Sequence, residues 1–454
     1  MQESQQENQS GFMIEKIKER PVNKKMLLRR TIITASMAVI FGLIACFTFL
    51  VLEPVISKWL YPEEPPQLVV FPEDQEEMSP EEMLAQNMEQ EKQNQEQQNQ
   101  QQQQSAMPEP GSVILEPEQV EEILSEVTLD LESYKEMYDS LSDYVKELNQ
   151  YMITVTGISS NIDWFNNVQE SEHQASGVII ATNGKELLIL VDYAPLKDAE
   201  TIRLTFYNDM QVDATVKEQD ADTGLAVLAV ELTKLDAEFL TEDLKIATLG
   251  SSNVKNIVGM PVIALGRPMG TAGSLGYGVI TAAATALSQP DTNYKLLQTD
   301  ITGSNNAGGM LFNLKGQLIG VITNKQGSSD MKNMITAYGI TELKKRIEKM
   351  SNGEKMAHLG ISGVDVTLNV HEELGVPFGA YITEIEMDSP AMQAGMQQGD
   401  ILVQMNEKII LSYGNYTTTL MQFKAGEVVK AVVMRQVQNE YKEMEFEITL
   451  GEAK

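Results

Sequence analysis

The stretch TDITGSNNAGGMLFNLKGQLIGVIT, residues 299–323, is the most informative part of the chain. Gly308 and Gly309 close a polar loop, an apolar segment follows, and the turn NLKGQ leads into a second apolar segment. This layout is typical of a loop that presents a nucleophile between two β-strands. The residue just before the glycines, where a nucleophile would stand, is Ala307. The loop therefore has the form of a catalytic loop without a reactive side chain.

Short apolar segments separated by turn residues surround this loop. From Gln150 onward they read YMITVTGI, ASGVIIATNGKELLILVDY, TIRLTFYNDMQVDATVKEQD, GLAVLAVEL, MPVIALGRP and YGVITAAATAL. Val, Ile and Leu dominate the segments, and Gly, Asn and Asp stand between them, which predicts an all-β barrel or sandwich. A helix-length amphipathic pattern follows only at residues 341–350.

Composition limits the function. A chain of 454 residues is long enough for two or three domains. Its net charge of -31 argues against a nucleic-acid partner, since phosphate binding needs a basic surface. Cys46 is the only cysteine, so no intramolecular disulfide or CxxC metal site can form. Histidine is limited to His173, His358 and His371 without metal-ligand spacing, and we expect no metal and no cofactor.

Residues 31–52 form an uncharged apolar stretch that would span about 33 Å as a helix, enough for a bilayer core. Residues 1–30 carry a basic cluster just before it, and acids follow it. The positive-inside rule then predicts a single-pass protein of the cell membrane with a cytoplasmic tail and extracytoplasmic domains. A cleaved signal peptide is the alternative, although no small-x-small cleavage site follows.

The region after the apolar stretch changes composition twice. Residues 53–113 are rich in Glu, Gln and Pro, which predicts a disordered acidic stalk. Residues 114–149 carry a heptad pattern at Val120, Leu124, Val127, Leu131, Tyr134, Tyr138, Leu141, Val145 and Leu148. This pattern predicts a helix that either joins subunits as a coiled coil or lies on the next domain.

The order of these segments resembles the HtrA/Deg family of serine proteases. Residues 150–350 resemble its trypsin-like double β-barrel, and residues 356–451 resemble the PDZ domain that follows it there. The motifs are SGVIIATNGKELLILVDYAPLKDAETIRLTF, DADTGLAVLAV, VIALGRPMG, YGVITA, LLQTDITGSNNAGGMLFNLKGQLIGVIT and SPAMQAGMQQGDIL. The resemblance implies a mainly β fold, preceded here by a transmembrane helix and a helical stalk.

The resemblance also locates the catalytic positions, and each lacks a reactive group. The histidine, aspartate and serine of active members correspond to Ala194, Gly224 and Ala307. The remnant of the oxyanion loop is Asn305, Gly308 and Gly309. A serine nucleophile needs a base and an orienting acid, and losing the nucleophile or base costs about a millionfold in rate. We therefore expect a pseudoprotease.

Two other functions remain open. An active serine endopeptidase with a relocated nucleophile would use Ser304, with His173 in a loop or Lys197 as its base. A mainly architectural envelope protein would instead have no affinity for peptides.

The PDZ resemblance implies a groove for chain ends. Such a domain adds a peptide as a strand and holds its terminal carboxylate on backbone N–H groups. The matching residues are Leu359, Gly360 and Ile361, with Tyr416 and Leu420 facing the groove. The alternative is that the apolar members of this set are core residues. We expect binding of unfolded polypeptides or protein C-termini, and a role as scaffold, chaperone or regulator in envelope protein quality control.

The resemblance finally implies partners. It favours a homotrimer assembled through the barrels, and it allows a related active protease as a partner.

Overall fold

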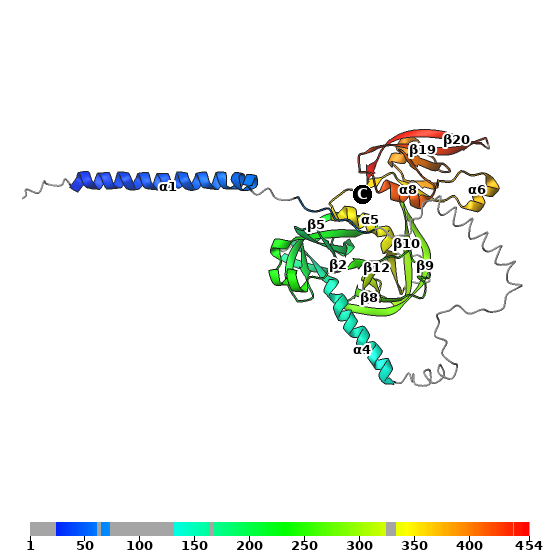
Figure 1. The fold of residues 1–454 in the computed structure, drawn as a ribbon, viewed down its shortest axis with the longest axis horizontal. Coiled ribbons are helices and arrows are strands. Elements are labelled where there is room, and N and C mark those ends of the chain that lie inside the picture. Colours follow the sequence, from blue (N-terminus) through cyan, green and yellow to red (C-terminus); the bar gives the residue numbers. More distant parts are fainter. Residues whose placement is uncertain are drawn as a thin grey trace, which may run out of the picture. The chain divides into compact units, whose positions relative to one another are not determined.

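The computed structural model describes residues 24–60, 65–72, 131–162, 168–323, 333–438 and 440–453. They fall into two compact units, Met1–Pro65 and Pro66–Lys454. In the first unit, helix α1 (Lys24–Leu60) contains an apolar stretch, Leu28–Thr48, that could cross a membrane by its length and composition (Figure 1). A signal sequence and an anchor both fit this helix.

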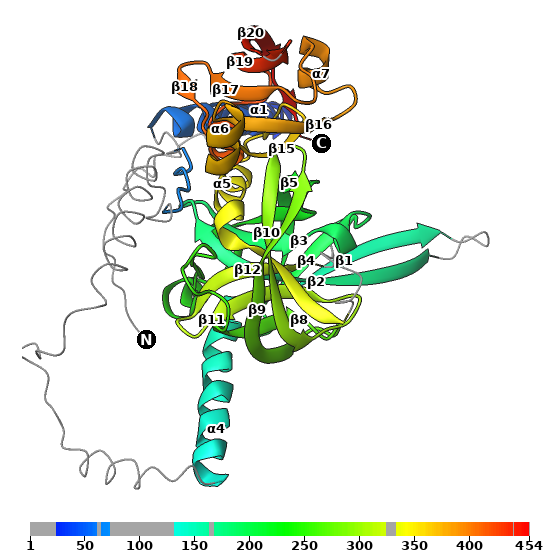
Figure 2. The same ribbon diagram turned by 90° about the vertical axis from the view of Figure 1, so that its right-hand side faces the viewer.

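The second unit begins with a closed barrel whose strands are ordered β1-β2-β3-β6-β5-β4. Its strands are β1 (Met152–Ile162), β2 (Val168–Thr182), β3 (Glu186–Asp192), β4 (Thr201–Thr205), β5 (Gln211–Asp220) and β6 (Leu225–Glu231). Short helical turns are η1 (Asn149–Tyr151), η2 (Ala194–Leu196), η3 (Leu232–Lys234) and η4 (Phe239–Asp243). The hairpin of β1 and β2 extends well beyond the barrel (Figure 2).

The second barrel is a seven-stranded sheet, ordered β11-β8-β9-β10-β13-β12-β7, that closes because β11 also pairs with β12. Its strands are β7 (Thr248–Leu249), β8 (Pro261–Arg267), β9 (Ser274–Gln289), β10 (Thr292–Thr302), β11 (Gly308–Asn313), β12 (Gln317–Thr323) and β13 (Met334–Gly339). Helix α5 (Ile340–Ser351) follows, at the amphipathic segment predicted from the sequence. The predicted double β-barrel is confirmed.

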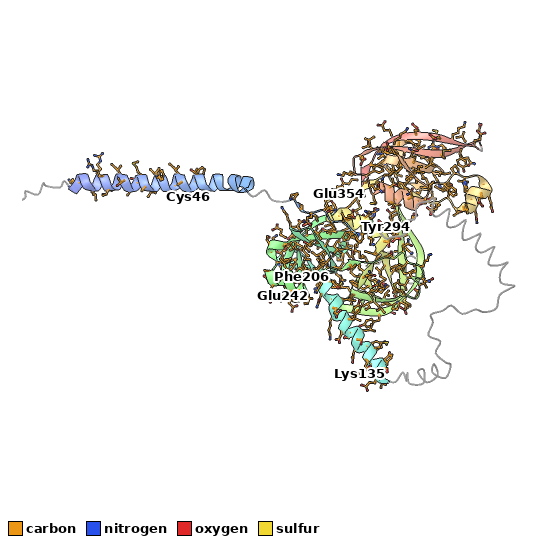
Figure 3. All side chains as sticks on the ribbon, viewed as in Figure 1. Cys46, Lys135, Phe206, Glu242, Tyr294 and Glu354 are labelled. Atoms are coloured by element: carbon orange, nitrogen blue, oxygen red, sulfur yellow. The ribbon has the colours of Figure 1, made fainter. Side chains whose placement is uncertain are left out.

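The continuous apolar run of β3 has a simple structural cause. Successive side chains of a strand point to opposite faces. Leu187 and Ile189 enter the core of the first barrel, whereas Leu188 and Leu190 join a second core that includes residues of both barrels. Figure 3 labels one aromatic residue of each core, Phe206 and Tyr294. A strand buried on both faces is apolar throughout instead of alternating.

Residues 65–72 form an extended strap on the second unit. Val69 exchanges two hydrogen bonds of 2.9 Å with the Asn352 side chain, and the N–H of Phe71 donates to Glu348 at 3.1 Å. The side chains of Val69 and Phe71 are buried. The prediction of a disordered stalk over 53–113 is therefore wrong for 65–72, where two apolar side chains reach the core. It is also wrong for 53–60, which belong to helix α1. Residues 61–64 and 73–130 lie outside the described part.

Helix α4 (Leu131–Leu148) confirms the helical prediction over the described part of 114–149. Its last turns pack on the core through Val145 and Leu148, as the second alternative predicted. Leu131 and Tyr134 at its start are exposed. The coiled-coil alternative stays a prediction, and its first three heptad positions lie outside the described residues.

The C-terminal part is a small β-domain with short helices. Its main sheet is ordered β15-β16-β17-β19-β20, with β18 on β17, and β14 pairs with β21. The strands are β14 (Ala357–His358), β15 (Ile361–Asp365), β16 (Ala380–Ile385), β17 (Ile401–Met405), β18 (Lys408–Ile409), β19 (Val428–Val437), β20 (Glu440–Thr449) and β21 (Gly451–Glu452). The helices are α6 (Leu368–Leu374), α7 (Pro390–Ala394) and α8 (Tyr413–Leu420).

A buried arginine on α5 joins several elements. Arg346 donates to both carboxylate oxygens of Asp220 at 3.0 Å and to the hydroxyl of Thr292 at 2.9 Å. Its guanidinium also lies over the ring of Tyr294, 5.3 Å from the centroid. Arg346 and Asp220 are 3% and 1% exposed, so each charge depends on the other for compensation.

We predict that Arg346→Leu destabilises the fold by about 3–5 kcal/mol, because the Asp220 carboxylate would remain buried without its partner. Arg203→Ala is the control, since the pair of Arg203 with Asp213 is exposed and should contribute less than about 1 kcal/mol. Chemical denaturation of the full chain in detergent, followed by near-UV circular dichroism, measures both. Equal effects of the two variants would contradict the prediction.

Candidate functional site

The loop predicted to present a nucleophile connects β10 to β11. The side chain of Ala307 is 5% exposed and packs in the apolar core of the second barrel. Gly309 has φ +122°, and a Cβ there would lie 2.1 Å from the carbonyl oxygen of Leu265. Strand β11 could not pair with β8 at this point if a larger residue replaced Gly309. The retained glycine is thus explained by packing alone.

The segments that hold the three predicted catalytic positions lie together. The N–H of Tyr193, next to Ala194, donates to the carbonyl of Gly224 at 2.9 Å. The Oδ2 atom of Asp192 lies 3.7 Å from the point where a Cβ of Gly308 would stand. Ala194 is exposed, and the backbone at Gly224 has φ +77°, which disfavours a non-glycine residue.

Two charged residues near this loop were not predicted from the sequence. Asp192 ends strand β3, in which Glu186 at the other end is the one further polar residue. Burial raises the pKa of the Asp192 carboxyl, while the N–H of Ala194 and the charge of Arg267 act against the rise. Arg267 donates to the carbonyl of Gln174 and, at 3.5 Å, to that of Asn306. A single acid at the end of an apolar strand was the only available signal. The geometry gives Arg267 a role in holding the loop.

The side chains considered for a relocated active site lie in three different segments, and none of the hydrogen bonds described here joins them. Ser304 Oγ accepts the N–H of Asn306 at 3.1 Å, which stabilises the turn. His173 lies in strand β2 opposite Gly157, so its predicted place in a loop is wrong; the β1–β2 hairpin is longer than the sequence pattern indicated. Lys197 is exposed at the end of η2. Among the described residues, no group of three or more His, Cys, Asp or Glu is placed to hold a metal ion.

The predicted carboxylate-binding loop holds a carboxylate, that of Asp291. The N–H groups of Leu359, Gly360 and Ile361 donate to its oxygens at 2.8, 2.9 and 3.1 Å. Gly360 has φ +84°, and a Cβ there would lie 2.3 Å from the Cβ of Ser389. The loop therefore requires glycine at its centre and presents three converging backbone donors, as in the carboxylate sites of peptide-binding domains.

Further donors complete the coordination of Asp291. The hydroxyl of Tyr416 donates to Oδ1, and Nδ1 of His358 lies 2.8 Å from Oδ2. Tyr416 thus lies at the predicted site, although it is fully buried. Leu420 is also fully buried in the core of the C-terminal domain, together with Leu359 and Ile361, as the alternative interpretation of these side chains held.

Asp291 and His358 each stabilise the charged form of the other. Burial by itself would raise the pKa of Asp291, but the hydrogen bond and charge of His358, with donors from Tyr416 and Gly360, lower it overall. Desolvation would lower the pKa of His358, but Asp291, Glu386 and Asp222 raise it overall. The two ring nitrogens of His358 lie 2.8 Å from Asp291 and 2.8 Å from Glu386, which favours the imidazolium form.

A cavity of about 580 Å³ adjoins the occupied loop. Residues of β15 and α8 form one side, with Val364, Thr417 and Thr418 among them. The other side is formed by α5 and by Phe71 of the strap, and Thr292 and Asn293 border it next to Asp291. In a PDZ domain, the space between the strand after the loop and the second helix is where a peptide lies. The lining of this cavity by β15 and α8 corresponds to the place where PDZ domains bind their peptides.

Comparison with known proteins agrees with this architecture. Residues 175–321 match the family model of the trypsin-like peptidase domain, and residues 357–450 match that of the PDZ domain. The chain thus combines a trypsin-fold domain with a PDZ domain. Its curated relatives include HtrA and DegP-like serine proteases, to which the chain is similar.

Two relatives and one solved structure illustrate the similarity. A probable periplasmic serine endoprotease DegP-like of Pseudomonas putida (strain GB-1) is 28% identical over 277 residues, which cover 59% of this chain and 54% of the relative. The serine protease Do-like HtrA of Lactococcus lactis subsp. cremoris (strain MG1363) is 25% identical over 334 residues, which cover 68% of this chain and 80% of the relative. The solved structure of the HtrA-type protease AlgW with decapeptide has a TM-score of 0.48 at 20% identity, and the match covers 67% of this chain and 96% of that one. The chain spans about half the length of the first relative.

We predict that His358 stabilises the docking of the PDZ domain in a pH-dependent way. Its raised pKa means that the contribution is complete below the ordinary value of about 6.5 and is lost as the pH rises through the raised value. The difference in melting temperature between the native chain and His358→Gln should therefore be larger at pH 6 than at pH 9. A difference that does not change over this range would contradict the prediction.

Proposed function

We propose that this chain is a membrane-anchored, catalytically inactive HtrA-like protein that binds unfolded polypeptides or protein C-termini through its PDZ domain. It would act as a scaffold, chaperone or regulator of protein quality control in the cell envelope. The observation that carries the proposal is the loop at Leu359, Gly360 and Ile361, whose three N–H groups converge on a carboxylate. A free chain end offers the same chemical group.

Inactivity is supported by the residues at the three catalytic positions. The side chains of Ala194 and Ala307 can neither accept nor donate a proton, and Gly224 has none. The methyl group of Ala307 also packs into an apolar core. The departure from the catalytic residues of the family thus lies in the residue types at these three positions.

Membrane anchoring is supported by the length of α1 and by the basic residues around its start. Relatives named as periplasmic proteins fit an extracytoplasmic location for the domains after this helix. The chain would form a homotrimer, as the resemblance to the HtrA family implies, and would also accept a related active protease as a partner.

We expect the purified full chain in detergent to leave unfolded casein intact and to escape labelling by a fluorophosphonate probe. The reason is that none of the three catalytic positions has a titratable group. Ser304→Ala is the control for a relocated nucleophile. Cleavage or labelling that disappears in this variant would overturn the proposed inactivity and support the endopeptidase alternative.

We expect Gly360→Ala to weaken binding of C-terminal peptides at least tenfold, because its Cβ would collide with Ser389 and displace the N–H donors. Gly426→Ala is the matched control: Gly426 has a similar φ of +81°, but no atom lies within 4 Å of its Cβ position. Fluorescence anisotropy measures binding of heptapeptides of mixed sequence with a free C-terminus. Equal affinities of the two variants would contradict a role of the loop.

A further inference from the structure

The residue that occupies the carboxylate loop belongs to the second barrel. Strands β9 and β10 pair up to Gln289 and Thr292, so Pro290 and Asp291 form a two-residue turn. Asp291 adopts φ +65°, in the left-handed region that Asp tolerates better than most residues. It is 3% exposed, although turn residues of a hairpin are ordinarily solvated. Asp291 is buried among the residues of the PDZ domain that donate to its carboxylate.

The hairpin tip also forms hydrogen bonds that a bound peptide would form. The N–H of Asp291 donates to the carbonyl of Ile361 at 2.7 Å, and the Asn293 side chain donates to the carbonyl of Gly363 at 3.0 Å. Ile361 and Gly363 are two residues apart on β15, so their carbonyls point to the same side of the strand. An added peptide strand would use these two acceptors together with the loop N–H groups. Asp291 and Asn293 thus reproduce the contacts of a chain end.

We propose that Asp291 is a tethered ligand of the PDZ groove, and that a C-terminal peptide binds only after displacing it. This inference rests on the proposed peptide-binding function. The five donors that surround the Asp291 carboxylate cannot serve a second carboxylate at the same time. The two ligands therefore exclude each other.

Competition lowers the apparent affinity for an external peptide. When only a fraction of the molecules has an empty groove, the apparent dissociation constant equals the intrinsic one divided by that fraction. A groove that is open in one molecule in ten or fewer would weaken binding at least tenfold. An incoming peptide can compensate by filling the adjoining cavity of about 580 Å³, which the hairpin tip leaves empty. The groove would thus favour chain ends with side chains that fit between β15 and α8.

Displacement of Asp291 from the loop would also change contacts in the barrels. Thr292, next to Asp291, receives a hydrogen bond from Arg346 at 2.9 Å, and Arg346 holds Asp220 of the first barrel. Removing the turn from the groove therefore strains or breaks a contact in the buried ion cluster. Peptide binding is in this way connected to the junction of the PDZ domain with both barrels.

The test compares Asp291→Asn with Asp209→Asn in the full chain in detergent. Asparagine tolerates the left-handed backbone but replaces one carboxylate oxygen with an amide that repels the loop N–H groups. Asp209 is the matched control because it has φ +63° in the turn between β4 and β5 and is exposed. The probe is a pool of fluorescent heptapeptides of mixed sequence with a free C-terminus, with the amidated pool as a second control.

We expect Asp291→Asn to bind the free-carboxylate pool at least tenfold more tightly than the native chain and Asp209→Asn, and the double variant with Gly360→Ala to lose this binding. Equal binding by the native chain, Asp291→Asn and Asp209→Asn would overturn the tethered-ligand inference and leave the peptide-binding function intact. If no protein binds the pool, the proposed function fails. Amide hydrogen exchange in the native chain then decides the inference separately, since unprotected N–H groups at 359–361 would overturn it.

Discussion

A carboxylate that is buried away from water must accept hydrogen bonds on most of its lone pairs. Asp291 of the second barrel meets this requirement only through donors of the PDZ domain. Burying an unpaired charge costs several kcal/mol, so its donors have to be in place together. They come from the loop before β15, from Tyr416 on α8 and from His358 on β14. The need to supply all of these donors therefore fixes the turn between β9 and β10 in one position relative to the PDZ domain, with His358 as an imidazolium.

The buried pair of Arg346 and Asp220 extends this arrangement to the first barrel. Asp220 lies in the sequence DADTG, whose last residue occupies the predicted position of a catalytic aspartate. Its carboxylate binds the arginine of α5 at 3.0 Å. This segment thus has a structural role in the fold.

The strap connects the region after α1 to the same junction. Val69 and Phe71 insert into the core beside α5, and Phe71 also borders the cavity next to the groove. Because apolar burial, and not only chain connectivity, holds the strap, the segment that follows the apolar helix contributes to the wall of the binding site. A soluble fragment that begins after residue 72 would lack this wall.

Local pattern was sufficient for the double barrel, the amphipathic helix at 341–350 and the glycine-centred loop, because strand alternation, turn residues and a left-handed glycine depend on near neighbours in the chain. The proposal of inactivity likewise depends only on which residues stand at 194, 224 and 307. The residue that occupies the carboxylate loop, by contrast, cannot be predicted from local sequence. The tetrapeptide QPDT predicts only a turn, and nothing in it indicates that residue 291 meets residues 359–361. That contact, like the burial of the strap in a region of disordered composition, arises because distant segments pack together, and only the tertiary structure decides it.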